Sequence, residues 1–118
     1  MTDLTPDLQF LVGEPLNGVS FVMDYVELHF NGSYLRCLAP PTVASNGVAL
    51  AFPGPGPRDA LCALIGADVR AIRAADGGEL CVEFGGGAVV TASLAHDGRS
   101  APEVLHFHNQ GTGETQFW

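Results

Sequence analysis

The chain carries the same pattern of apolar residues and glycines twice, in the same order. Each copy reads as a short helix that ends at a glycine, then a strand, then an alternating hairpin. The aligned pairs lie 53 residues apart, and 54 apart after one inserted residue: Leu8 with Leu61, Leu11 with Leu64, Val12 with Ile65, Gly13 with Gly66, Leu16 with Val69, Val19 with Ile72, Val26 with Leu80, Leu28 with Val82, Phe30 with Phe84, Gly32 with Gly86 and Leu35 with Val89. Because every pair matches apolar with apolar or glycine with glycine, the sequence predicts an internal duplication.

Each predicted helix begins near a proline and ends at a glycine. Thr5 is expected to cap the first helix, with Pro6 at its first position and Gly13 after its last turn. Pro57 and Gly66 mark the same points of the second helix. The apolar stripe of the second helix is expected to face the core: Leu61, Leu64 and Ile65. Helices of about two turns are marginal alone, so tertiary packing must hold them.

The hairpin of the first copy follows a strand expected over 17–23 and turns at Asn31-Gly32. This two-residue loop fits a type I′ turn, which requires positive φ at both positions. The turn fixes the register: Leu28 faces Leu35, Val26 faces Cys37 and Glu27 faces Arg36. One face of the hairpin is therefore apolar, and the other carries four polar residues: Glu27, His29, Tyr34 and Arg36.

The hairpin of the second copy follows a strand expected over 69–75. With Gly85-Gly86 as its loop, Val82 faces Val89 on the core side. The other face then carries polar residues on one strand and apolar residues on the next: Glu79, Cys81 and Glu83, and Ala88, Val90, Ala92 and Leu94. A strand that is apolar on both faces is usually covered. We therefore expect the C-terminal segment, a second protomer or a partner protein to lie against it.

With 118 residues the chain is long enough to bury a core, so we predict a single domain that needs no disulfide or structural metal. The first repeat spans about 5–52 and includes a further hairpin at the Ser-Asn-Gly of 45–47. A linker rich in proline and glycine at 53–57 leads to the second repeat at about 57–95, and C-terminal strands follow at about 103–118. The predicted class is α+β, mostly β, with two helix-plus-meander halves in a pseudo-twofold sandwich or partly open barrel.

The charge balance excludes several classes of partner. Thirteen acidic residues outnumber five arginines and no lysine occurs, which gives a formal net charge of −8. This charge repels nucleic-acid phosphates and anionic membranes, so neither is an expected partner. No apolar run reaches the ~18 residues of a membrane span, and the acidic start lacks a signal-peptide pattern. Three cysteines without close spacing predict reduced thiols in a cytoplasmic protein, with Cys62 packed in the core. The absence of lysine beside abundant alanine and glycine is typical of a GC-rich bacterial genome.

Few patterns in the sequence are typical of catalysis. Residues 85–87 are glycine-rich but precede a strand, whereas a phosphate-binding loop precedes a helix. No serine lies in a Gly-x-Ser-x-Gly elbow. His106 and His108 alternate on one strand and are candidates for a metal site. A third ligand would come from one of three nearby residues: His96, Asp97 or Glu103. The two histidines are equally explained as the polar face of a half-exposed strand, so we predict neither a cofactor nor an enzyme activity.

Two stretches resemble a family of small bacterial domains of unknown function: "LVG" followed by "LHFNG", and "LIGADVRAI" followed by "DGGELCVEFGGGAVV". In that family a Leu-Ile-Gly turn leads into glycine-closed hairpins, and a strand that combines an acidic with an aromatic residue follows. This strand maps onto "EVLHFH", where Glu103 fits the pattern while Leu105 and His106 replace the aromatic residue. The resemblance covers about residues 8–109 and implies no catalytic residues. Some relatives are thought to be immunity-like partners of secreted toxins.

The predicted function is a non-enzymatic protein-interaction module, either homo-oligomeric or an immunity- or inhibitor-like partner of another protein. Its acidic surface would steer a basic partner. Six residues are candidates for the interface: Glu27, His29, Glu79, Glu83, Val90 and Trp118. Two alternatives stay open, namely a carrier that encloses a small apolar ligand between its halves and a metal-binding protein that uses His106 and His108.

Overall fold

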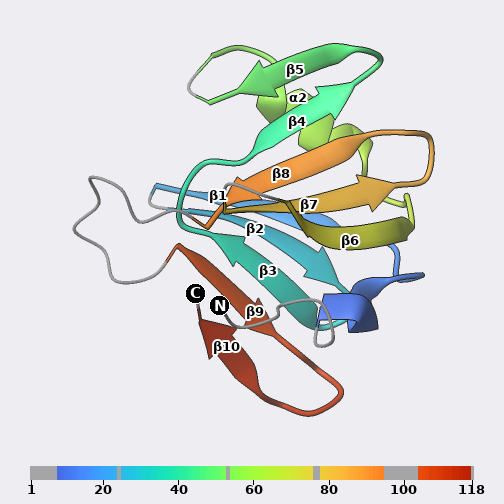
Figure 1. Cartoon of the computed structure of the whole chain (residues 1–118), viewed down its shortest axis with the longest axis vertical. Coiled ribbons are helices and arrows are strands. Elements are labelled where there is room, and N and C mark those ends of the chain that lie inside the picture. Colours follow the sequence, from blue (N-terminus) through green and yellow to red (C-terminus); the bar gives the residue numbers. More distant parts are fainter. Residues whose placement is uncertain (1–7, 24, 53, 76–77, 95–103, 118) are drawn as a thin grey trace.

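The computed structural model describes residues 8–23, 25–52, 54–75, 78–94 and 104–117. Its elements in chain order are the 3₁₀ turn η1 (Gln9–Leu11), β1 (Gly18–Val22), β2 (Tyr25–Phe30), β3 (Ser33–Cys37), β4 (Thr42–Ser45), β5 (Val48–Ala51), the helix α2 (Pro57–Ala63), β6 (Val69–Ala75), β7 (Glu79–Phe84), β8 (Val89–Ser93), β9 (Leu105–His108) and β10 (Thr115–Phe117) (Figure 1). The predicted class, α+β and mostly β, is confirmed. The helix cap predicted at Thr5 and Pro6 lies outside the described residues.

The strands form two five-stranded antiparallel sheets, which we call the first and the second sheet. The order is β1-β2-β3-β9-β10 in the first sheet and β6-β7-β8-β4-β5 in the second. Each sheet combines a three-strand meander from one half of the chain with a hairpin from the other half (Figure 1). The β4–β5 hairpin joins β8, and the β9–β10 hairpin joins β3. The halves are therefore interlocked through an exchange of hairpins.

The two halves also share a pairing register where their first strands begin. Val19 lies opposite Leu28, and in the second half Ile72 lies opposite Val82. Pro15 and Asp68 form an isolated bridge between the halves, flanked by four backbone hydrogen bonds. These bonds form two matched pairs: Gly13 N–H to Val69 O and Gly66 N–H to Leu16 O, both 2.8 Å, and Leu16 N–H to Ala67 O and Val69 N–H to Glu14 O, both 3.0 Å. Within each pair, one bond becomes the other when 53 is added to the residue number from the first half and subtracted from the residue number from the second half.

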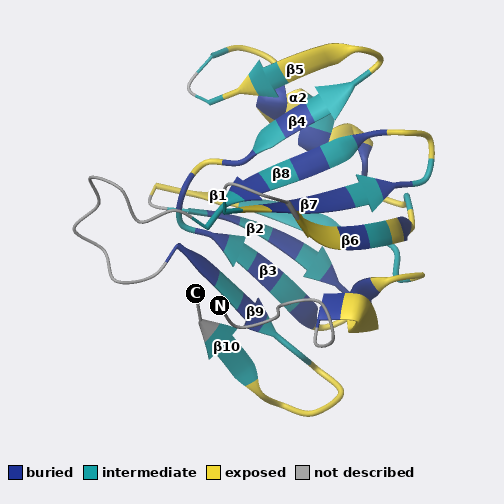
Figure 2. Cartoon of the chain, viewed as in Figure 1, coloured by how far each residue is buried: buried dark blue, intermediate teal, exposed yellow. Residues whose placement is uncertain are grey.

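The inner faces of both sheets contribute to one contiguous apolar core. Buried and partly exposed residues alternate along β2, β3 and β8, as the two-residue period of a strand requires (Figure 2). Phe30, Phe84 and Phe107 are the largest fully buried side chains, and burial of such a ring contributes about 1.5–3 kcal/mol. The helices also cross between halves, because η1 contacts β6 and α2 contacts β1 and β4.

The predictions for the first hairpin are confirmed. Asn31 and Gly32 have φ of 48° and 94°, which is the pair of positive values that a type I′ turn requires. The register matches as well: Leu28 pairs with Leu35, Val26 with Cys37 and Glu27 with Arg36. The hairpin predicted at residues 45–47 is present as β4–β5, with Asn46 and Gly47 in its turn.

The register predicted for the second hairpin was wrong by one residue. Its loop has three residues, Gly85 to Gly87, because Phe84 N–H donates to Ala88 O at 2.9 Å and closes the turn there. Val82 therefore pairs with Val90 instead of Val89. Val90 is 1% exposed and belongs to the core, so the predicted apolar second face does not exist. The outer side of β8 instead carries Val89, Thr91 and Ser93, all partly exposed.

The second helix is present, with Pro57 at its start and Gly66 in the left-handed region at φ 98°, but two of its predicted contacts were wrong. The helix ends at Ala63, so Ile65 lies in the turn beyond it and is exposed instead of completing the apolar stripe. Cys62, expected in the core, is exposed, because it lies about 100° around the helix from the buried Leu61.

Candidate functional site

The outer face of the first sheet carries most of the polar residues that the sequence singled out. The register arranges them in two rows across the sheet: Ser20, Glu27, Arg36 and His106 in one, and His29, Tyr34, His108 and Thr115 in the other. Three of the four histidines of the chain lie in these rows. We call this surface the histidine face.

Arg36 lies at the centre of the histidine face. Its Nε donates a hydrogen bond of 2.6 Å to Glu27 Oε2. Its guanidinium carbon lies 4.8 Å from the ring centre of Tyr25 and 5.0 Å from that of Tyr34, which are cation–π distances. Burial lowers the pKa of Arg36, but the hydrogen bond and the charge of Glu27 outweigh this effect and raise the pKa above its usual value. The two charges therefore satisfy each other within the sheet.

Ser20, His29 and Glu27 lie together but do not have the geometry of a catalytic triad. Ser20 Oγ lies 2.9 Å from His29 Nε2, and Glu27 Oε1 lies 3.5 Å from the same nitrogen. In a triad the nucleophile and the carboxylate engage the two different ring nitrogens, so that the carboxylate orients the ring for proton transfer. Glu27 competes here with Ser20 for one nitrogen, so this cluster does not activate the hydroxyl in that way.

The two histidines proposed as metal ligands, His106 and His108, both lie half-buried on the histidine face. His108 Nδ1 lies 3.0 Å from Thr115 Oγ1, and its ring stacks on Tyr34 with centres 5.2 Å apart. Among the residues that the structure describes, no three metal-ligating side chains come together. The suggested third ligands, His96, Asp97 and Glu103, lie outside the described residues.

The other interface candidates are not brought together with Glu27 and His29. Glu79 and Glu83 lie on β7, on the outer side of the second sheet. Glu83 Oε2 accepts a hydrogen bond of 2.9 Å from Arg73. Val90 is in the core, and Trp118 lies outside the described residues. The six predicted residues therefore do not form one surface.

The cysteines differ sharply in their accessibility. Cys37 is buried, and burial raises the pKa of its thiol to about 12. Because the thiolate is the reactive form, Cys37 is unreactive near neutral pH. Cys81 is also buried, whereas Cys62 is exposed on α2. A cysteine-specific reagent should therefore meet Cys62 first among these three.

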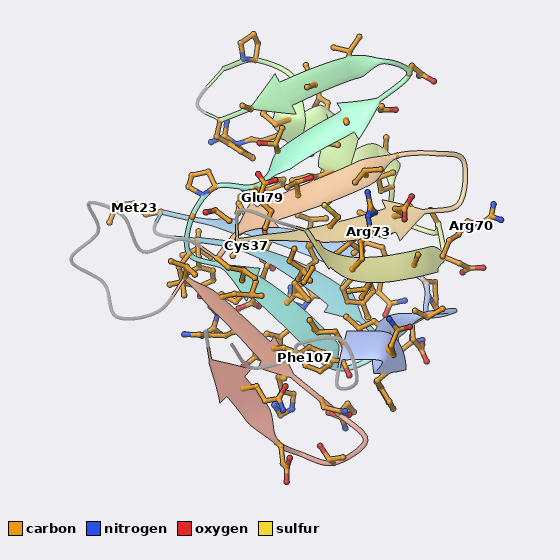
Figure 3. All side chains as sticks on the ribbon, in the orientation of Figure 1. Met23, Cys37, Arg70, Arg73, Glu79 and Phe107 are labelled. Atoms are coloured by element: carbon orange, nitrogen blue, oxygen red, sulfur yellow. The ribbon has the colours of Figure 1, made fainter. Side chains whose placement is uncertain are left out.

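A cluster that the sequence did not predict lies where β1 turns into β2. Val22 is 45% exposed and Met23 is 94% exposed, and Met23 projects away from the body of the molecule (Figure 3). They belong to a set of side chains that we call the apolar patch: Phe21, Val22, Met23, Pro40, Phe52 and Arg58. Together with Tyr25 and Val26, these side chains line a cavity of about 130 Å³.

Arg58 joins the two aromatic rings of the apolar patch. Its guanidinium carbon lies 5.8 Å from the ring centre of Phe21 and 5.4 Å from that of Phe52. The rings are 6.5 Å apart and tilted by 50°. Arg58 reaches this position because Pro57 starts α2 directly after the proline- and glycine-rich linker. A cation, two rings and an exposed methionine thus share one small surface.

A comparison of the two halves draws attention to the apolar patch. Phe21 pairs with Val26, and Ala74, 53 residues after Phe21, pairs with Leu80. The buried member of each pair is large and apolar, while the other member changes from phenylalanine to alanine. The ring of Phe21 has contacts with Phe52 and Arg58 that the small side chain of Ala74 does not reproduce in the other half.

No protein-family model, curated protein or solved structure matches the chain. Within the described ranges, no helix is long and apolar enough to cross a membrane.

Proposed function

We propose that this chain is a non-enzymatic protein-interaction module and that the apolar patch binds its partner. The observation that carries the proposal is the run of three consecutive apolar residues in water, Phe21 to Met23, beside the stacked Phe52 and Arg58. Aromatic residues and arginine are enriched among the residues that dominate binding energy at protein interfaces. The patch supplies both kinds of residue next to a hollow.

The size of the hollow favours a protein partner over a small ligand. Pockets for small molecules usually have volumes of about 300–1,000 Å³. The cavity of about 130 Å³ in the apolar patch suits one protruding apolar side chain. A wider hollow of about 410 Å³ is lined by Arg70 and Glu83, so it offers little to an apolar ligand.

The charge of the chain defines the partner further. A net charge of −8 accelerates association with a basic surface and slows association with an acidic one. The partner is therefore a basic protein that presents an apolar side chain. An immunity- or inhibitor-like role in a bacterial cytoplasm, suggested by the family resemblance and the composition, would use such a contact.

The proposal includes an internal duplication of one unit made of a helix, a three-strand meander and a hairpin. The matched registers and the exchanged hydrogen bonds around Pro15 and Asp68 support it. The second copy then extends to about 117 instead of 95, because β9–β10 joins the first sheet as β4–β5 joins the second. If the halves are copies of one unit, only the first copy carries the apolar patch.

The proposal is tested by selecting binders from a displayed library of bacterial protein fragments, with the full chain as bait. Affinities of the selected fragments are then measured for the wild type and for Met23→Lys. We expect at least a tenfold loss, because the lysine introduces a charge into a contact that excludes water. The association rate should also fall as salt is added, since the charges steer the encounter.

The matched control is Val12→Lys, the same change at an apolar residue that is 39% exposed but lies outside the patch. It should leave binding unchanged. Both variants should keep the free energy of unfolding of the wild type within about 0.5 kcal/mol, because neither side chain is buried. Fragments that bind Met23→Lys as well as the wild type, or that are lost with Val12→Lys, would refute the patch as the binding surface.

A further inference from the structure

The free edge of β5 is the least protected strand edge in the described part of the molecule. Proteins usually shield such edges with charges, prolines, bulges or a covering element, since an open edge invites another strand. At the other edges, α2 contacts β1 and η1 contacts β6. β6 itself carries Arg70 and Arg73 and has a bulge between Val69 and Ala71. β10 has only three residues. β5 carries Val-Ala-Leu-Ala, without charge, proline or bulge, and is mostly exposed (Figure 2).

The pairing of β5 with β4 shows which backbone groups point outward. The two-residue turn at Asn46-Gly47 makes Ser45 and Val48 a hydrogen-bonded pair. Because such pairs alternate along an antiparallel ladder, the N–H and C=O of Ala49 point away from β4. The carbonyl of Ala51 points the same way but accepts a hydrogen bond of 3.0 Å from Gly54 N–H. Ala49 is therefore the residue of β5 that offers both a donor and an acceptor at the edge.

β5 also lies in the longest uncharged run of the chain. Residues 37–57 contain no aspartate, glutamate, lysine, arginine or histidine, although the chain has 18 acidic and basic residues, five of them Lys or Arg and 13 Asp or Glu. Two copies with a net charge of −8 each repel one another. The repulsion is weakest where both copies present an uncharged element, which makes β5 the favoured place for two copies to meet.

We infer that two copies of this chain associate through β5, in an antiparallel pair with Ala49 opposite Ala49 of the second copy. An antiparallel pair of identical strands is self-complementary about a twofold axis, so each copy supplies the donor and acceptor that the other needs. The two second sheets then form one continuous sheet. The small alanine side chains allow the two β5 strands to approach closely. The contact then depends on main-chain hydrogen bonds and on the absence of charge. The contact is centred on Ala49 and uses neither Phe21 nor Met23, so it does not depend on the proposed function.

Sedimentation equilibrium of the full chain over a range of concentrations tests this inference. We expect a dimer of twice 12.3 kDa at high concentration. Ala49→Lys and Ala49→Glu each place two like charges opposite one another, which destabilises a strand pair. Each variant alone should raise the dimer dissociation constant at least tenfold. An equimolar mixture of the two should recover a dimer, because the opposed charges then attract, and this recovery also shows that both variants fold.

The control is Val22→Lys, which introduces the same charge at an exposed apolar residue of the patch and should leave the dimer intact. Four results would overturn the inference: a monomer at every concentration, a dimer insensitive to both Ala49 variants, no recovery in their mixture, or dissociation by Val22→Lys. The last result would instead assign self-association to the apolar patch.

Discussion

The first half of the chain, residues 8–52, and the second half, residues 57–117, agree at several core positions and differ at the surface of β1 and β6. Phe30 and Phe84 are each 1% exposed, and Leu28 and Val82 are nearly as deeply buried. Phe21 and Ala74, which are more exposed, differ. A polar group at a core position would lose its contacts with water, whereas an exposed position carries no such constraint. Burial therefore accounts for the matched core residues, and the apolar patch is the part of β1 that burial does not explain.

A second difference concerns the turns of the two central hairpins. Asn31-Gly32 closes the first with two residues, while Gly85 to Gly87 close the second with three. The extra residue shifts β8 by one position, so that Val90 takes the place that Leu35 holds in β3. The two halves thus place an apolar side chain at the same core position with turns of different length, which an exposed turn permits.

The largest expected effect tests whether the matched core positions are energetically equivalent. Phe30→Ala and Phe84→Ala should each lower the free energy of unfolding by about 3–5 kcal/mol, because each removes a fully buried ring and leaves a cavity. Urea titration measures both losses. If one variant loses several times as much free energy of unfolding as the other, the two positions are equivalent in geometry but not in energy.

A smaller effect is expected at the glycines that end the two helix segments. Gly13 and Gly66 have φ of 91° and 98°, and a Cβ at either position would meet nothing within 4 Å. Gly13→Ala and Gly66→Ala should therefore each cost about 1–2 kcal/mol through backbone conformation alone. Gly18→Ala is the control, because Gly18 lies in β1 outside the left-handed region, and it should cost less than either.

The smallest effects should separate the ion pairs of the two halves. Glu27 is 12% exposed and accepts from Arg36, while Glu83 is 41% exposed and accepts from Arg73. Glu27→Gln should cost about 1 kcal/mol, since a charge-assisted hydrogen bond becomes a neutral one. Glu83→Gln should cost less, because exposed pairs contribute about 0–1 kcal/mol and are screened by salt. Urea titrations at low and high salt measure both changes, and equal losses would contradict the contrast.

The sequence predicted those parts of the fold that a few neighbouring residues specify. Asn31-Gly32 specifies one turn type and hence one register, so the first hairpin was predicted in full. Three successive glycines at 85–87 permit a loop of two or three residues, and the register there was missed. No neighbouring residues specify the exchange of hairpins between the sheets, because the partner strand of β4 is determined by packing between distant parts of the chain.

The candidate site shows the same limit. Glu27 and His29 were predicted on one polar face, because alternation along a strand determines which side chains share it. Phe21, Phe52 and Arg58 come from three separate segments, and only the packing of α2 beside β1 brings them together. The register-matched Ala74 offered a clue, but using it requires knowing that both positions lie in water.

The exchange of hairpins also determines the order in which this protein can acquire structure during its synthesis. When residues up to 52 have left the ribosome, β3 lacks its neighbour β9, and the β4–β5 hairpin lacks β8. Neither half can complete its own sheet, and the apolar inner face of β2 stays without the second sheet that covers it. Only the arrival of residues 105–117 supplies the remaining strands of the first sheet. Chains that stop early therefore expose apolar surface and open strand edges, the features that chaperones bind and that drive aggregation.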